Sequence, residues 1–213
     1  MTNILKSIDT EFIKFINILT LKFDWKSEVN KKFKLTNTFI KYFLILTITN
    51  IISYIFIKLQ RPESKYVLEL FIFSYFMCVL MMIFNNYFID KITALKQSKF
   101  KQLLNFNLEL SSAIIIFGII INILQIIVFL IFGKINVFVD IIFSIIGTGI
   151  FVISFLSLIK IVENIYGVKD TRAIRNIIYA FLIVFAIFII ISLIFFTIWS
   201  IVYISTHPEL LKL

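Results

Sequence analysis

The chain alternates between long apolar runs and short polar segments. Five runs of about 20 residues or more carry few charges, and this length matches what an α-helix needs to cross the hydrocarbon of a bilayer. The predicted spans are residues 39–57, 66–88, 110–132, 137–159 and 174–204. The pattern therefore predicts an all-α fold, an integral membrane bundle of five transmembrane helices that fills residues 39–204 as one domain.

The residues before the first span show a different pattern. Within residues 1–38, apolar side chains recur every three or four positions, at Leu5, Ile8, Phe12, Phe15, Leu19 and Phe23. This spacing predicts an amphipathic helix, and the absence of a clean apolar stretch with a cleavage site argues against a signal peptide. Two placements stay open: the helix lies on the membrane interface, or it packs on the cytosolic ends of the bundle. Residues 205–213 form a short outside tail.

The basic residues are distributed unevenly between the two sides of a five-span chain. Of 21 Lys and Arg residues, sixteen lie on the N-terminal side, up to the first residues of the first span, or in the second and fourth loops and the adjoining start of the fifth span, and five lie on the other side. Positively charged loops stay in the cytoplasm, so the N-terminus is predicted to be cytoplasmic and the C-terminus outside. We expect a prokaryotic cell membrane, with an endomembrane of the ER or Golgi as the alternative.

Composition supports the membrane assignment and limits the kinds of binding and catalytic site that the chain can form. The sequence is 61% hydrophobic, with a mean hydropathy of +1.03 and a net charge of +9. Because topology explains the charge, we expect the lipid bilayer as a partner and no nucleic acid. With only Cys78 and His207 available, the chain cannot build a Cys or His metal cluster. It also has no recognisable nucleophile or phosphate-binding motif, so we expect no enzyme activity, no catalytic residues and no cofactor.

Polar and small residues inside the spans are the candidates for helix packing. The amides of Asn50, Asn85, Asn86 and Gln125 are expected to form hydrogen bonds between helices, because an unpaired amide is costly in hydrocarbon. Gly147 and Gly149 flank Thr148 in the fourth span, where small residues allow close approach of another helix. At the end of the same span, Lys160 and Glu163 are three residues apart and can form an ion pair.

Two polar segments carry a family resemblance. "KITALKQSKFKQLLNFNLELSSAII" approaches the third span, and "SLIKIVENIYGVKDTRAIRNIIYAF" joins the fourth span to the fifth. With the predicted topology, they resemble the Yip family, the Ypt/Rab-GTPase-interacting domain, over roughly residues 39–194. Val168 follows the Tyr166–Gly167 pair where eukaryotic members have proline, which points to the prokaryotic-type branch. The resemblance implies a five-span non-enzymatic protein and a cytosolic interaction loop containing Tyr166, Gly167, Arg172 and Arg175.

Two functions follow from these observations. The first is a membrane scaffold or adaptor, linked to membrane organisation or trafficking, that presents its N-terminal helix and basic loops to a cytosolic or membrane protein partner. The alternative is a small transporter, or the membrane subunit of a transport complex, in which the intramembrane Asn residues and the central Gly-Thr-Gly line a path. The sequence leaves open whether the protein is a homo-oligomer.

Overall fold

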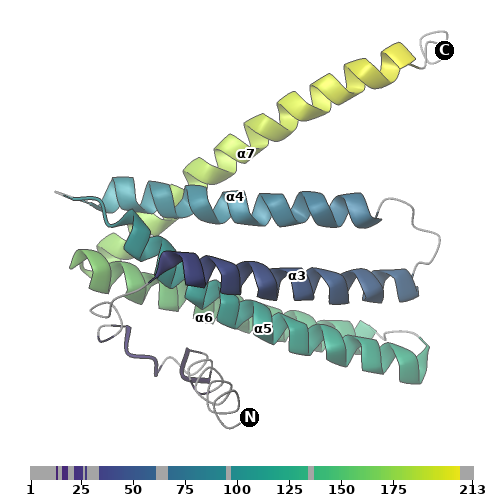
Figure 1. Ribbon diagram of the computed structural model, residues 1–213, viewed down its shortest axis with the longest axis horizontal. Coiled ribbons are helices and arrows are strands. Elements are labelled where there is room, and N and C mark those ends of the chain that lie inside the picture. The colour runs from purple at the N-terminus through teal and green to yellow at the C-terminus, as the bar shows by residue number, and fades with distance from the viewer. Residues whose placement is uncertain are drawn as a thin grey trace.

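The described part of the chain is all-helical and contains five long helices (Figure 1). The computed structural model describes residues 13, 16–18, 22–25, 27, 34–60, 67–94, 97–133 and 137–206. The helices are α3 (Leu35–Gln60), α4 (Val67–Thr93), α5 (Phe100–Phe132), α6 (Val137–Tyr166) and α7 (Asp170–Thr206). All five are long and apolar enough to cross a membrane. The prediction of an all-α bundle with five spans is confirmed, and the protein is a polytopic integral membrane protein.

Two of the helices continue well beyond the apolar runs that predicted them. α5 begins at Phe100 instead of residue 110, and α6 ends at Tyr166 instead of residue 159. The additional turns of α5 bury Leu103, Leu104 and Phe106 against the rest of the protein. Burial in the protein's own core therefore stabilises these turns, and a hydropathy pattern that predicts contact with lipid does not include them.

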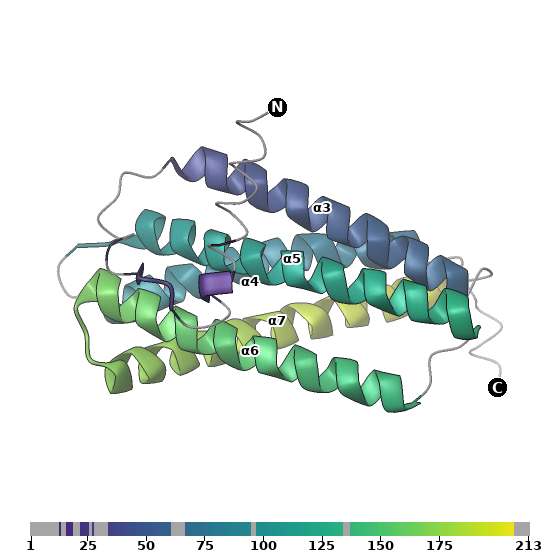
Figure 2. The ribbon, with the colours of Figure 1, turned by 90° about the horizontal axis from the view of Figure 1, so that it is seen from below.

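The helix connections bring five helix termini to one end of the bundle, which we call the basic end. It comprises the first turns of α3, α5 and α7 and the last turns of α4 and α6 (Figures 1 and 2). The main cluster of buried apolar residues lies in these turns and includes Ile89, Phe106, Val162, Ala173 and Ile177. A smaller cluster joins Tyr42 and Leu46 of α3 to α5. The intramolecular core is thus concentrated near the basic end.

The opposite halves of α6 and α7 have little contact with the rest of the protein. Ile145 and Phe151 of α6 are exposed, as are Ile190 and Leu193 of α7. Figure 1 shows α7 leaving the other helices at an angle towards its C-terminal end. Such apolar surfaces are stable when they face lipid, because the hydrocarbon replaces the protein as the apolar environment.

The described residues before α3 show contact with the bundle. The side chains of Ile18 and Trp25 are buried, and the Trp25 ring lies edge-on to Phe106 of α5 with 6.1 Å between ring centroids. Ile13 and Ile16 remain exposed. Of the predicted apolar face, Phe23 is half-buried, and Leu5, Ile8, Phe12, Phe15 and Leu19 lie outside the described residues. Packing on the bundle is therefore the placement seen for Ile18 and Trp25.

Candidate functional site at the basic end

The buried carboxylate of Asp90 joins three segments at the basic end. Asp90 lies near the end of α4 and is 2% exposed. Its Oδ1 accepts hydrogen bonds from the Tyr166 hydroxyl at 2.5 Å and from the Lys99 backbone N–H at 2.8 Å. Its Oδ2 accepts one from the Ser98 hydroxyl at 2.6 Å. A buried charge is tolerated when several donors compensate its lost hydration, so these bonds fix the loop before α5 and the end of α6 to α4.

Gly167 ends α6 and starts the short turn into α7. Its φ of 65° lies in the left-handed region, and its N–H donates to the carbonyl of Glu163 at 2.8 Å. This is a common helix C-terminus, in which glycine avoids the steric cost that a Cβ would impose. The Lys99 ammonium also donates to the carbonyl of Ile165 at 2.5 Å, which satisfies one of the last carbonyls of the helix.

The predicted interaction loop therefore contains one residue with a structural contact inside the protein and others that lie at or near its surface. Tyr166 directs its hydroxyl into the protein, to Asp90, and so has a structural contact that the sequence did not predict. Gly167 and Arg175 are exposed and Arg172 is half-buried. A role of Arg172 and Arg175 in binding a partner stays a prediction.

Three pairs of polar side chains connect helices next to the Asp90 cluster. Thr38 donates to Asn105 at 2.7 Å, Asn107 donates to Asn86 at 3.1 Å, and Asn176 donates to Thr93 at 3.2 Å. They link α3 to α5, α5 to α4, and α7 to α4. The prediction that Asn86 forms an interhelical hydrogen bond is confirmed. Asn105 and Asn107 were missed because they precede the third apolar run, where an amide is usually solvated, and Asn176 was missed at the start of the fifth run.

The other predicted intramembrane amides lack this arrangement. The Oδ1 of Asn85 and the Nδ2 of Asn50 are buried and have no hydrogen-bond partner among the described residues, and Gln125 is half-buried. Asn50 lines a groove of about 390 Å³ between α3 and α4, together with Tyr54 and Tyr75. Asn85 lines a separate cavity of about 430 Å³ between α4, α5, α6 and α7. Interhelical bonding is thus not seen for Asn50 and Asn85.

The two central glycines of α6 do not pack against another helix of this chain. Gly147 and Gly149 are exposed, and a Cβ built on either would meet no described atom within 4 Å. No close helix contact is seen at these glycines within the described part of the monomer, and packing between copies of the chain stays a prediction. The reason is that this half of α6 lies beyond the core, with its small residues on the outer surface.

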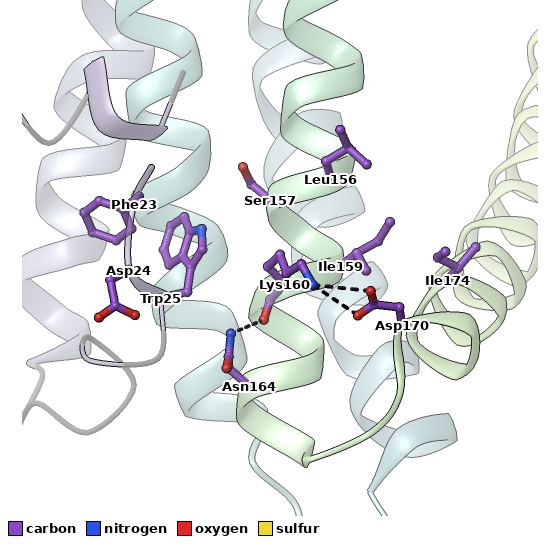
Figure 3. A pocket seen from close by; sticks show the side chains of 10 residues that line it. All are labelled: Phe23, Asp24, Trp25, Leu156, Ser157, Ile159, Lys160, Asn164, Asp170 and Ile174. Atoms are coloured by element: carbon purple, nitrogen blue, oxygen red, sulfur yellow. Dashed lines mark hydrogen bonds and ion pairs between the residues drawn. The ribbon is translucent and has the colours of Figure 1, made fainter. Parts of the chain in front are cut away.

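A pocket of about 380 Å³ lies between the N-terminal residues and the turn from α6 to α7 (Figure 3). Trp25 lines one side, and Ser157, Lys160 and Asp170 line the other. The Lys160 ammonium is 2.8 Å from the Glu163 carboxylate, which confirms the predicted ion pair, and 3.3 Å from Asp170. These charges are largely exposed, so the pairs contribute little to stability.

The buried or paired charged groups at the basic end already have partners within the protein. The Lys160 ammonium is paired with carboxylates, and Asp90 is occupied by internal donors. Among the residues that the structure describes, no three His, Cys, Asp or Glu side chains group as metal ligands do. The features that remain available are exposed basic side chains on a packed polar frame.

Comparison of the chain with protein-family models, curated proteins and solved structures gives no match.

Proposed function

We propose that this protein is a non-enzymatic membrane scaffold or adaptor that presents its basic end to an acidic surface of a cytosolic protein. The observation that carries the proposal is the charge of the exposed residues at this end. Among the described residues, eight basic side chains are exposed there: Lys22, Lys34, Lys91, Lys99, Lys101, Lys160, Lys169 and Arg175. The exposed acidic side chains described at the same end are Asp24 and Asp170. Such an excess of positive charge favours association with an acidic partner and speeds their encounter.

The packing beneath this surface supports the same proposal. The Asp90 cluster and the three interhelical polar pairs hold all five helix termini in fixed positions. A partner that binds the basic residues therefore meets a preorganised surface and loses less conformational entropy than with a mobile loop. In the proposed orientation this end is cytosolic, and the apolar halves of α6 and α7 anchor it in the membrane.

The test is affinity purification of the full chain from its native cell in gentle detergent, followed by mass spectrometry. Wild type is compared with the double variant Lys169→Glu/Arg175→Glu, and Lys58→Glu, at the opposite end of α3, is the matched charge-reversal control. We expect a cytosolic partner that is retained by wild type and the control, lost by the double variant, and released by raised salt. Equal recovery with the double variant, or recovery only of transport components, contradicts the proposal.

A transporter is the second candidate, and the cavity lined by Asn85 is the observation that favours it. An unpartnered buried amide within a helix bundle is suited to contact a polar substrate. The test is solute flux into liposomes containing the purified protein, with Asn85→Leu as the variant. Flux that depends on Asn85 supports transport, and its absence across sugars, amino acids and ions counts against it.

A further inference from the structure

One cavity is bounded by α4, α5, α6 and α7, and Tyr42 of α3 also lines it. Its volume of about 430 Å³ falls within the range of small-molecule sites in proteins. Most of the lining is apolar and includes Leu110, Ile114, Phe155 and Val184. Met81 and Met82 also line it, and their flexible thioether side chains can adjust to the shape of an apolar ligand.

One polar group in this lining lacks a partner. Asn85 is 6% exposed, and its Oδ1 is buried without a hydrogen-bond donor among the described residues. The neighbouring Asn86 differs, because its Oδ1 accepts a hydrogen bond from Asn107. Buried acceptors in folded proteins nearly always have a donor, so the cavity is suited to a ligand that supplies one.

The absence of charge in the cavity lining and the position of the cavity restrict the class of ligand further. None of its lining residues carries a charged side chain, so burying an ionic headgroup there would be unfavourable. Four aromatic or thioether side chains of the lining are exposed on the outside of the bundle: Met81, Phe151, Phe181 and Phe185. Because this surface faces hydrocarbon in a membrane, a ligand would enter sideways from the bilayer.

We infer that this cavity binds an uncharged single-chain lipid bearing a hydroxyl group, which donates a hydrogen bond to Asn85 Oδ1 while the aliphatic chain lies against α5, α6 and α7. Long-chain alcohols and monoacylglycerols share this chemistry. The hydroxyl group of such a lipid can donate a hydrogen bond to the unpartnered Asn85 Oδ1, and its aliphatic chain can pack against the apolar lining of the cavity. This inference goes beyond the scaffold function and does not depend on it.

The experiment uses the full chain in phosphatidylcholine nanodiscs and a long-chain alcohol carrying a diazirine in its chain. Photolabelled residues are mapped by mass spectrometry, and labelling is competed with unlabelled octadecanol or with its methyl ether, which has the same chain without the donor. We expect labels at the cavity wall and about two- to tenfold stronger competition by the alcohol, the range of one neutral hydrogen bond. In Asn85→Leu this preference should disappear.

Two further variants complete the design. Ser154→Trp places a large ring at the half-buried cavity wall and should abolish labelling, whereas Asn50→Leu makes the same change as Asn85→Leu in the separate groove and should leave it unaltered. If Asn85→Leu does not fold, two results still test the inference. They are the competition by the alcohol relative to the ether in wild type, and the labelling of Ser154→Trp. Labels scattered over the outer surface, or equal competition by alcohol and ether in wild type, overturn the inference.

A second copy of the chain is the competing occupant. Cys78 lines the same cavity, is exposed, and is the only cysteine in the sequence. Rapid formation of a Cys78–Cys78 disulfide between copies in the nanodisc, with no labelling of the cavity, would show that a neighbouring protomer fills it and would also overturn the inference.

Discussion

The Tyr166 hydroxyl donates a hydrogen bond to the buried carboxylate of Asp90, 76 residues earlier in the chain, at 2.5 Å. This bond joins the last residue of α6 to the last turns of α4. Since Asp90 also holds Ser98 and Lys99, the same carboxylate positions the start of α5. The termini of three helices thus depend on one buried charge.

Removing the Tyr166 hydroxyl should destabilise the basic end. Tyr166→Phe keeps the ring and removes one donor to a charged acceptor, so we expect a loss of about 1.5–3 kcal/mol in the free energy of unfolding. Denaturant unfolding of the purified protein in micelles measures this loss. Tyr87→Phe is the control, because Tyr87 is exposed and its variant should unfold like wild type. Equal stability of the two variants would show that the bond to Asp90 contributes nothing.

Adding a methyl group should destabilise the protein at Gly167 but not at Gly147. Gly167 has a φ of 65°, so Gly167→Ala places an L-residue in the left-handed region and should cost about 1–2 kcal/mol. Gly147→Ala should not destabilise the monomer, because its Cβ meets no described atom within 4 Å. Thermal unfolding in detergent compares the two. If Gly147→Ala instead weakens self-association in gel filtration, this face of α6 packs between copies.

The Asn86–Asn107 pair should show measurable energetic coupling. A double-mutant cycle with Asn86→Leu and Asn107→Leu isolates the bond between α4 and α5. We expect a coupling of about 0.6 kcal/mol, with an upper limit of about 1.7 kcal/mol, the range known for membrane helices. Combining Asn107→Leu with Asn50→Leu is the control, because Asn50 lines a different groove, and this pair should be additive. A coupling of zero for Asn86 and Asn107 would contradict the hydrogen bond.

Trp25 should behave as a residue buried in protein, which separates the two placements of the N-terminal segment. The sequence has two tryptophans, so Trp199→Phe leaves Trp25 as the only one. Because Trp25 packs on Phe106, we expect blue-shifted emission that brominated lipids quench poorly. Phe106→Ala should shift the emission to longer wavelength. Strong quenching by brominated lipid would instead place Trp25 in the membrane interface.

The proposed orientation predicts which end of the bundle faces the cytosol. In a Cys78→Ser background, the Lys169→Cys variant should react with an impermeant thiol reagent only after the cells are opened. The Lys58→Cys variant, changed at the opposite end of α3, should react in intact cells. The reverse pattern would place the basic end outside and remove the basis for a cytosolic partner.

The sequence by itself determined the number of membrane spans and the all-α class, because both depend on local composition. A run of about 20 apolar residues forms a helix in lipid whatever its neighbours are. The same local rule failed at the start of α5 and the end of α6, where burial in the protein extends the helices. The Lys160–Glu163 pair was also predictable, since a helix brings residues three apart together.

Only the tertiary structure decided which residues distant in the sequence are partners. Asp90 with Tyr166, Asn107 with Asn86, and Trp25 with Phe106 are each distant in sequence, and nothing in their local patterns specifies the pairing. Asn85 and Asn86 are adjacent and chemically identical, yet one lacks a partner for its Oδ1 and lines a cavity while the other bonds to Asn107. Successive residues of a helix point in directions about 100° apart, so the position of the neighbouring helices determines the environment of each.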